Sequence, residues 1–413
     1  MRFDELKNKK IIILGKGLEG ITTYRVLKKI FPKNVIEIIE PKKEPDLEKK
    51  LKSYSVIIKS PGIPPYQIKK KYTTLTNIFF SNIKNLTIGV TGSKGKSTTA
   101  TLIYQILKQA GKKVALLGNI GKPAIEVFLK KINPKTIFVL ELSSYQLNDI
   151  QVSPHVAVIT ALFPEHLDYH QTLENYYQAK KNLIRYSQKD SYFIYLSKYR
   201  LLNKWAQHFK GKSIDASSTL PFKISNSRII GQHNIDNIKL AYQVAKIFHI
   251  TDITIKKSID NFNPLPYRLE FIGKFKDIEF YNDALSTTPE STIAAIKSLK
   301  KIGAIFLGGL DRGYNFSSLI SLIIKKRIPV VVLFPSSGER IYQLLIKKIN
   351  KSYHPKIFQT NSMEQAVKFA YKQTPKNTVC LLSTASPSYS LWKNYQEKGD
   401  LFQKFVKKYG SQN

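Results

Sequence analysis

Short runs of aliphatic residues alternate with longer amphipathic stretches along nearly the whole chain, beginning with IIIL at Ile11. A short apolar run predicts a buried strand, and an amphipathic stretch predicts a helix that covers it. Strands and helices that alternate in this order are typical of parallel sheets joined by crossover helices. The pattern therefore predicts an α/β protein.

The predicted elements group into three segments. A chain of 413 residues is longer than one ordinary domain, so more than one core is expected. LTIGVTG opens a second series near residue 86, and the proline-bearing stretch NFNPLPYR predicts a linker before the third. The third series opens with EFIGKFKDIEF, whose alternation predicts a hairpin. We expect domains at residues 1–86, 87–264 and 265–413.

Composition excludes several classes of protein. No apolar run approaches the roughly 18 residues of a membrane span, and the start MRFDELKNKK lacks the apolar segment of a signal peptide. We therefore expect a cytoplasmic protein with no membrane contact, and its one cysteine, Cys380, as a buried core residue. The net charge of +37 suggests nucleic-acid binding, but the lysines are spread along the whole chain, which favours a general lysine bias.

The strongest motif is TIGVTGSKGKSTTATLIYQIL, an apolar strand followed by a glycine turn and a helix. In this arrangement backbone N–H groups face an anion, Lys96 meets the outer phosphates of a nucleotide, and the Ser97 hydroxyl holds Mg²⁺. Val90 stands where a full Walker A motif has its first glycine, so the loop has the shorter form GxxGKS. The motif predicts an ATP site made by Gly92, Ser93, Lys94, Gly95, Lys96, Ser97 and Thr98.

A second glycine motif, GKGLEG, follows the first predicted strand and resembles a dinucleotide fingerprint. It leaves three interpretations open: a nicotinamide or flavin cofactor, another nucleotide diphosphate, or a tight turn only. The first segment is short for a complete dinucleotide domain, which favours a nucleotide diphosphate, with SPG as a second loop and an acidic residue after the next strand. The residues concerned are Gly15, Gly17, Gly20, Glu40, Ser60 and Gly62.

Polar residues follow two strands of the second segment. Glu141 ends TIFVLEL, and a carboxylate directly after a buried strand is a candidate Mg²⁺ ligand, with a capping or surface role as the alternative. FPEHLDYH places His166, Asp168 and His170 after the next strand. This group suggests zinc only weakly because no further ligand is evident nearby. A solvated loop is the alternative, more so for His170 than for His166.

Two later motifs are uninformative by spacing alone. Lys180, in YYQAKKNL, has the spacing of an exposed helix lysine. GQHN, with Asn237 one helical turn beyond it, predicts a polar helix start with Asn234 as its cap.

Together the motifs TGSKGKST, ELSSYQL, FPEHLDYH, YYQAKKN, GQHN, PYR and LLSTASPSYSLWKNYQEKGD resemble, in this order and over essentially the full length, those of the Mur ligases. ELSSYQL and the last motif resemble most nearly the glutamate-adding branch. The resemblance implies a Rossmann-like N-terminal domain that binds a UDP-sugar, a central P-loop ATPase domain with a parallel sheet, and a Rossmann-like C-terminal domain that binds ATP and the amino acid. It implies that ATP phosphorylates the carboxylate of UDP-N-acetylmuramoyl-L-alanine and that glutamate, in the D form, then displaces phosphate, in cytoplasmic peptidoglycan precursor synthesis.

The resemblance also assigns roles to single residues, in a protein expected to be a monomer that binds no nucleic acid. It implies two Mg²⁺ ions and a carbamate on Lys180, which would turn this cation into an anionic ligand. The residues are Lys96, His166 and Lys180 for catalysis; Ser97, Glu141, His166 and Lys180 for the metal ions; Asn234, Asn237, Arg268 and Asp283 for ATP; Asn119 for the UDP-sugar; and Thr287, Arg312 and Ser386 for the amino acid.

The chain departs from the family pattern at the amino-acid site. Where the usual glutamate ligase has D-S-K-A-T, this chain has DALST, so Leu285 replaces a lysine that would approach the phosphates. Arg312 stands where a lysine usually holds the glutamate carboxylate, which an arginine can bind with two hydrogen bonds. Glu40 and Pro41 also depart from the usual uracil-contact residues. L-glutamate or another amino acid, a folylpolyglutamate-type ligase and a nucleic-acid-stimulated ATPase remain alternatives.

Overall fold

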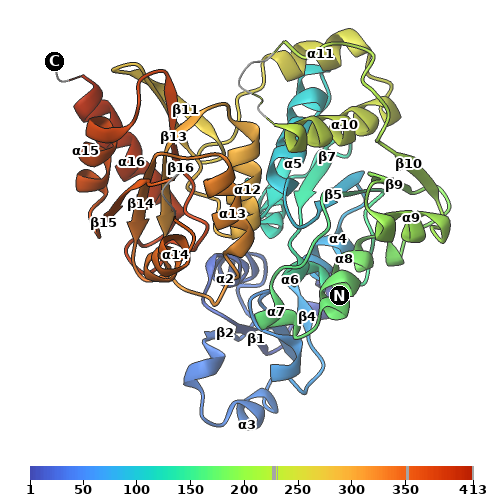
Figure 1. Cartoon of the computed structure of the whole chain (residues 1–413). Helices are drawn as coiled ribbons and strands as arrows, with labels where there is room; N and C mark the ends of the chain where they lie inside the picture. Colours follow the sequence, from blue (N-terminus) through green and yellow to red (C-terminus); the bar gives the residue numbers. More distant parts are fainter. Residues whose placement is uncertain (226–228, 230, 350–352, 412–413) are drawn as a thin grey trace. The chain divides into compact units, whose positions relative to one another are not determined.

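The computed structural model describes residues 1–225, 229, 231–349 and 353–411 and confirms the predicted α/β class. Three sheets of four, six and six strands follow one another along the chain (Figure 1). The chain forms two compact units: the first holds Met1–Ser225 and Asp236–Phe262, and the second holds the rest of the described chain. The first unit contains two of the sheets, and the domain boundaries after residues 86 and 264 remain predictions.

The first sheet has the strand order β2-β1-β3-β4, with every pair parallel. Its first three strands match the predicted apolar runs, whereas β4 has two residues and is too short to leave a pattern. The elements are α1 (Phe3–Leu6), β1 (Ile11–Leu14), α2 (Leu18–Ile30), β2 (Ile36–Ile39), η1 (Pro41–Lys43), α3 (Leu47–Leu51), β3 (Val56–Lys59), η2 (Pro65–Gln67), β4 (Thr73–Thr74) and α4 (Leu75–Asn82).

The GKGLEG motif makes the turn between β1 and α2. Gly15 has a φ of 98°, in the left-handed region that glycine adopts without strain. Gly20 lies in the first turn of α2, where a Cβ would come within 1.9 Å of the Gly15 carbonyl oxygen. Helix α2 therefore packs directly on the turn, and this contact leaves no space for a side chain at residue 20.

The second sheet is also fully parallel, in the order β10-β9-β8-β5-β7-β6. Strand β10 was not predicted because its residues are mostly exposed and carry no apolar run. The elements are β5 (Thr87–Thr91), α5 (Lys96–Gln109), β6 (Val114–Gly118), η3 (Ala124–Leu129), β7 (Ile137–Glu141), α6 (Ser144–Leu147), β8 (Val156–Ile159), α7 (Leu167–His170), α8 (Leu173–Arg185), β9 (Tyr192–Tyr195), α9 (Arg200–Gln207), β10 (Lys212–Asp215), α10 (Gln232–Ile247) and α11 (Asp252–Asp260).

The first two sheets share one hydrophobic core. Phe79 of α4 packs edge-on against Phe138 of β7, with ring centroids 5.8 Å apart. Phe3 of α1 packs in the same way on Phe128 of η3 at 4.7 Å. Apolar burial therefore fixes the first sheet against the second, as expected for parts of one compact unit.

The third sheet, in the second unit, has the order β11-β12-β16-β13-β14-β15. The hairpin predicted from EFIGKFKDIEF is confirmed as the antiparallel pair β11–β12, and the remaining pairs are parallel. The elements are β11 (Glu270–Phe275), β12 (Ile278–Asn282), α12 (Pro289–Ser298), β13 (Ile302–Gly308), α13 (Ser317–Lys325), β14 (Val330–Phe334), α14 (Ser337–Ile346), β15 (Lys356–Gln359), α15 (Met363–Gln373), β16 (Thr378–Leu382) and α16 (Tyr395–Gly410).

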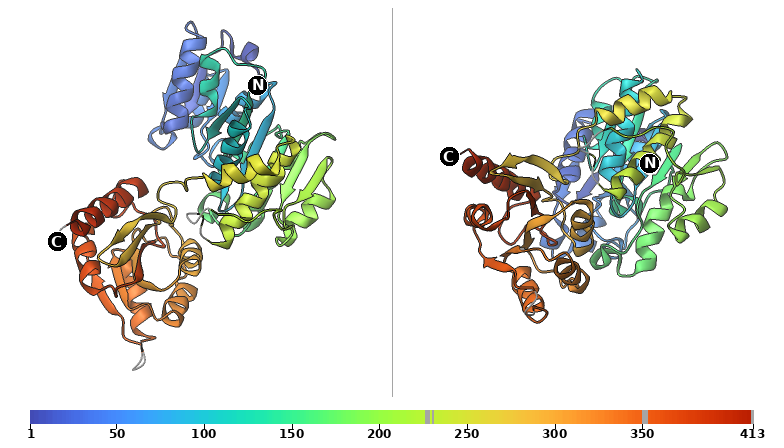
Figure 2. Two further views of the ribbon diagram at one scale, coloured as in Figure 1. Left: turned by 90° about the horizontal axis from the view of Figure 1, so that it is seen from above. Right: turned by 45° about the horizontal axis from the view of Figure 1, so that its top comes forward.

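Helices cover both faces of the third sheet, as the two further views show (Figure 2). Helices α12, α13 and α14 pack on one face and α15 and α16 on the other. Successive strand residues alternate between these two cores, so the strands appear in the sequence as continuous apolar runs. Cys380 is fully buried in the second core, as predicted.

Replacing Gly20 by alanine is expected to lower the stability of the first unit by about 1–3 kcal/mol, because the new Cβ would meet the Gly15 carbonyl oxygen. Gly17→Ala is the matched control, since a Cβ there would meet nothing within 4 Å. The midpoint of urea unfolding, followed by circular dichroism, measures the effect. Equal midpoints for the two variants would contradict the close packing of α2 on the turn.

Candidate active site

The phosphate loop connects β5 to α5 at the carboxyl edge of the second sheet. Gly92 and Gly95 have φ values of 148° and 91°. A Cβ on Gly92 would lie 2.0 Å from Thr160 Oγ1, and one on Gly95 would lie 2.3 Å from Asn237 Oδ1. Close neighbours as well as backbone geometry therefore require glycine at both positions. Lys96 begins α5, so the helix N-terminus faces the loop.

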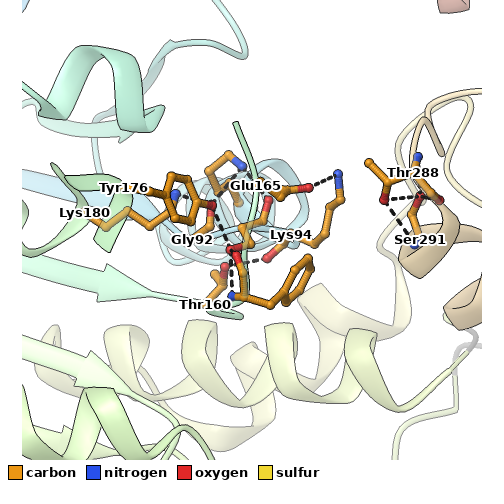
Figure 3. Close-up of polar contacts among 11 residues, drawn as sticks. Gly92, Lys94, Thr160, Glu165, Tyr176, Lys180, Thr288 and Ser291 are labelled. Atoms are coloured by element: carbon orange, nitrogen blue, oxygen red, sulfur yellow. Dashed lines mark hydrogen bonds and ion pairs between the residues drawn. The ribbon is translucent and has the colours of Figure 1, made fainter. Parts of the chain in front are cut away.

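Two lysines converge on one carbonyl oxygen of this loop (Figure 3). Lys96 Nζ donates to the carbonyl oxygens of Gly92 and Ser93 at 3.0 and 2.9 Å, and Lys180 Nζ donates to Gly92 at 2.8 Å. The Lys180 ammonium also lies 4.7 Å from the centre of the Tyr176 ring. The loop therefore brings two lysine side chains next to the place where a phosphate would bind.

Hydrogen bonds to neighbouring segments of the first unit hold the phosphate loop in place. Ser93 Oγ donates to the Phe163 carbonyl oxygen at 2.6 Å and bonds the Tyr176 hydroxyl at 2.8 Å, and Ser93 N–H donates to Ala161. Thr160 Oγ1 donates to the Lys94 carbonyl oxygen at 2.6 Å. Ser93, predicted to contact ATP, thus uses both its hydroxyl and its N–H within the protein. Nothing in the sequence motif pointed to Thr160.

Lys94 of the loop forms an ion pair with Glu165 that sequence reasoning did not anticipate. Lys94 Nζ lies 2.7 Å from Glu165 Oε1, and the Glu165 side chain is only 9% exposed (Figure 3). Its signal in the sequence was the acid directly before His166, on the segment that follows β8.

His166 lies on the same segment with a φ of 56°, its ring 5.0 Å from that of Tyr145. Desolvation lowers the pKa of His166, Lys96 adds to the shift, and Glu165 opposes it. The residue is exposed, so solvent screens these charges, but the direction favours a neutral ring near pH 7. A neutral imidazole offers one nitrogen lone pair to a metal or a water molecule.

His170 is not on a solvated loop, which was the alternative interpretation of this residue. The residue is 3% exposed, its Nε2 lies 3.0 Å from Ser144 Oγ, and its ring is stacked with that of Tyr145. The turn of α7 places it inward, a consequence of tertiary packing that its polar sequence context concealed. The side chain of Asp168 lies outside the described part of the structure.

Glu141 ends β7 and is 4% exposed, with its Oε2 buried and lacking a hydrogen-bond partner in the described chain. An unpartnered buried carboxylate oxygen is costly, and a cation would satisfy it. Ser97, also buried, is the second residue of α5, the helix that follows the neighbouring strand β5. Among the residues that the structure describes, no three His, Cys, Asp or Glu side chains gather closely enough to hold a metal ion by themselves. The donor set therefore fits Mg²⁺ that is also bound by phosphate oxygens.

Lys180 is 1% exposed, so the exposed position expected from spacing alone was wrong. Burial, with Lys96 next in effect, lowers its pKa well below the usual range. Asn237 joins the same site, since its Oδ1 accepts from Thr99 Oγ1 at 3.2 Å. Asn234 lies inside the first turn of α10 as its third residue, so the predicted capping position was also wrong.

The residues predicted for the UDP-sugar surround the end of β1. Ser60 Oγ donates to the Gly15 carbonyl oxygen at 3.4 Å, and the N–H of Lys16 donates to Glu40 Oε2 at 3.3 Å. Gly17 caps α2, and Gly62 follows Ser60 on the second loop. Asn119 lies apart from these residues, with its N–H donating to the Glu141 carbonyl oxygen at 3.1 Å.

Asp283, in the second unit, follows β12 and is buried. Its Oδ2 accepts hydrogen bonds from Ser286 and Ser383, the latter at 2.8 Å, and its Oδ1 accepts from the Leu269 N–H at 3.2 Å. Burial raises the pKa of Asp283 to about 6, and these hydrogen bonds and Arg268 oppose the shift. The hydrogen bond from the Leu269 N–H links the Asp283 carboxylate to the backbone next to Arg268.

The three residues predicted for the amino acid differ in accessibility. Arg312 is exposed and Thr287 is half-buried. Ser386 is fully buried, with its hydroxyl 2.7 Å from that of Ser337. The nearby Ser388 is 2% exposed, and its hydroxyl has no partner within the described residues, so Ser388 is a polar group that sequence reasoning missed.

A phosphate loop, an adjacent carboxylate and converging lysines at the edge of a parallel sheet define an ATP-using α/β enzyme. Residues 90–245 match the Mur ligase middle domain. The UDP-N-acetylmuramoylalanine--D-glutamate ligase of Acetivibrio thermocellus is 30% identical over 97% of this chain and 97% of its own length. The corresponding ligase of Streptococcus agalactiae is 30% identical over 96% of each chain. The protein belongs to the Mur ligase family.

Solved structures share the fold at lower identity. The MurF ligase of Thermotoga maritima, in complex with ADP, has a TM-score of 0.64 at 15% identity, covering 98% of this chain and 97% of that one. The folylpolyglutamate synthase of Mycobacterium tuberculosis has a TM-score of 0.59 at 12% identity, covering 80% of this chain and 92% of that one. Both confirm the predicted fold class.

Replacing Glu141 by glutamine is expected to remove most of the gain in nucleotide affinity that Mg²⁺ provides, by about tenfold or more, because a carboxylate ligand is lost. Titration calorimetry with ADP, with and without Mg²⁺, separates this gain from metal-free affinity, which should persist. Glu174→Gln, at an exposed position of α8, is the control. An undiminished Mg²⁺ effect in Glu141→Gln would rule out this ligand.

Proposed function

We propose that this enzyme joins D-glutamate to UDP-N-acetylmuramoyl-L-alanine, with conversion of ATP to ADP and phosphate, in peptidoglycan precursor synthesis. The alanyl carboxylate takes the γ-phosphoryl group of ATP and becomes an acyl phosphate. The amine of glutamate then attacks the acyl carbon, a proton is lost, and phosphate leaves. Phosphorylation is needed because a free carboxylate is a poor acyl donor.

One observation carries the proposal: the phosphate loop, the unpartnered oxygen of Glu141 and the buried amine of Lys180 all belong to the carboxyl edge of the second sheet. This edge is where parallel α/β sheets bind ligands. The names of the relatives, which match over 96–97% of this chain, supply the substrates.

Side chains and backbone N–H groups of this chain are proposed to neutralise the negative charge of the ATP phosphates. Lys96 and the N–H groups at the start of α5 bind the phosphates of ATP, and Asn237 supports the loop from α10. Ser97 and Glu141 hold the first of two Mg²⁺ ions, and His166 helps to place the second. When bound, Mg²⁺ neutralises phosphate charge as it develops. Because Leu285 stands in place of the family lysine, Lys96 is proposed to neutralise a larger part of the phosphate charge than it does in relatives that have that lysine.

Lys180 is proposed to be carbamylated. Burial lowers the pKa of its ammonium group, which favours the neutral amine, and a neutral amine adds to carbon dioxide with loss of a proton to give a carbamate anion. That anion would turn a repulsive neighbour of Lys96 into an attractive one and into a metal ligand.

Residues of the second unit are proposed to bind ATP and the amino acid. Arg268 and Asp283 serve ATP with Asn234, and Arg312 binds a carboxylate of glutamate through two hydrogen bonds. Thr287 and Ser386 belong to the same amino-acid site by resemblance.

We further propose a cytoplasmic monomer that acts without nucleic acid or membrane. Within the described residues, no helix has the length and apolar character needed to cross a bilayer. The enzyme's positive charge is expected to attract its anionic substrates, an effect that salt screens.

The test is phosphate release from ATP with UDP-N-acetylmuramoyl-L-alanine and a panel of D- and L-amino acids, followed by the product mass. We expect D-glutamate to stimulate release and to add one glutamyl residue to the UDP-sugar. Stimulation by L-glutamate instead would correct the stereochemistry. Absence of stimulation and added mass with every amino acid would refute the proposal, and release stimulated by a folate or by RNA would replace it.

Replacing Lys180 by alanine is expected to lower ligation at least about 100-fold, because the anionic group at the metal site is lost. Short-chain carboxylates should restore part of this activity by occupying the vacated space. Lys181→Ala, on the same helix, is the control and should remain active. A fully active Lys180→Ala enzyme would rule out the carbamate.

A further inference from the structure

Lys59, the last residue of β3, has a fully buried side chain outside the phosphate site. Its Nζ donates to the Ile63 carbonyl oxygen at 2.8 Å and forms an ion pair with Asp149 Oδ2 at 2.9 Å. Burying an ammonium group costs several kcal/mol unless it is paired and hydrogen-bonded. The general lysine bias of this chain therefore does not explain why a lysine is buried at position 59. The contacts of Lys59 with Ile63 and Asp149 do explain it.

The ion pair joins the two sheets of the first unit, because Asp149 follows α6 of the second sheet. The Tyr72 hydroxyl donates to Asp149 Oδ1 at 2.9 Å, and the Tyr72 ring centre lies 5.4 Å from Lys59 Nζ. Burial lowers the pKa of Lys59, and Asp149 opposes this shift. The Lys59 ammonium thus has the Ile63 carbonyl oxygen and the Asp149 carboxylate as partners on the protein side of the Ser60–Ile63 turn.

That turn is held by its inward carbonyl groups. The Ile63 N–H donates to the Ser60 carbonyl oxygen at 3.2 Å, which closes the turn. The Tyr169 hydroxyl lies 2.8 Å from the Pro61 carbonyl oxygen and 3.2 Å from that of Ile63. Lys59 contacts the same Ile63 oxygen, so the second sheet fixes the inner side of the turn through Asp149 and Tyr169.

The outer side of the turn is open. A Cβ on Gly62 would meet nothing within 4 Å, and Ser60 Oγ lies 3.4 Å from the Gly15 carbonyl oxygen of the GKGLEG turn. We propose that the Lys59–Asp149 ion pair holds the Ser60–Gly62 turn against the turn at Gly15. In this way the ion pair positions the residues that bind the UDP-sugar. The identity of this ligand rests on the proposed function.

A second ion pair joins the same two sheets and provides a matched control. Arg25 of α2 lies 2.9 Å from Glu126 of η3, with the arginine side chain 65% exposed. Exposed pairs of this kind contribute roughly 0–1 kcal/mol. Arg25→Met therefore removes a charge that joins the sheets without touching the turn.

The experiment compares wild type, Arg25→Met and the double variant Lys59→Met/Asp149→Asn. The double variant removes both charges, because Lys59→Met alone leaves a buried carboxylate unpaired and risks misfolding. The first measurement is amide hydrogen exchange at Ser60, Gly62 and Ile63. We expect exchange at least about tenfold faster in the double variant and unchanged in Arg25→Met, since exchange reports local opening.

The second measurement is the dissociation constant for UDP-N-acetylmuramoyl-L-alanine and, separately, for ATP. In the double variant we expect the UDP-sugar constant to rise about 10- to 100-fold, because misplacement by about 1 Å is costly. The ATP constant should stay within about twofold.

Four results are informative. Unchanged exchange in the double variant overturns the proposal, as does faster exchange with unchanged UDP-sugar affinity. Equal losses of UDP-sugar and ATP affinity with a lower unfolding temperature also overturn it, since the pair would then support the whole unit. If wild type does not bind the UDP-sugar, the proposed function fails, and the exchange data alone decide whether the pair orders the turn.

Discussion

The active site depends on the carbonyl oxygen of Gly92. The residue adopts a φ of 148°, and a Cβ there would lie 2.0 Å from Thr160 Oγ1, so only glycine fits at this position. Lys96 and Lys180 both donate to that oxygen. One glycine position, which has no space for a side chain, thus brings Lys96 and Lys180 to the same oxygen.

The electrostatics of the site follow from this convergence. Burial lowers the pKa of Lys180 well below its usual range, and repulsion by the Lys96 ammonium near the same oxygen adds to the shift. Glu165, which pairs with Lys94, opposes this shift, and Glu141 ends the neighbouring strand. The protein alone leaves an uneven balance of charge that nucleotide phosphates and Mg²⁺ would correct.

The sequence allowed the fold to be predicted better than the site. Apolar runs and the two glycine turns were sufficient for the long strands, because burial on both faces leaves a continuous pattern. They failed for β4 and β10, which are short or exposed. Within the site, the glycines and Glu141 could be found from their places after strands. The burial of Lys180 and His170 could not, since each depends on packing between elements distant in the sequence. Thr160 belongs to no recognised motif, and the ion pair of Glu165 with Lys94 could not be read from FPEHLDYH.

Three lysines in the described part of the chain are buried, and the lysine-rich composition of the chain does not explain them. Lys59 and Lys180 each donate to a turn that follows a strand, and Lys398 donates to Thr384, which follows β16. Burial lowers the pKa of Lys398 to about 7, although Asp283 opposes the shift. Each of the three sheets therefore has one buried ammonium or amine group at its carboxyl edge. A lysine bias places cations on the surface, where they cost little, and cannot account for these three. The net charge of +37 therefore mostly describes the surface, while the chemistry of the fold rests on the few lysines that the protein removes from water.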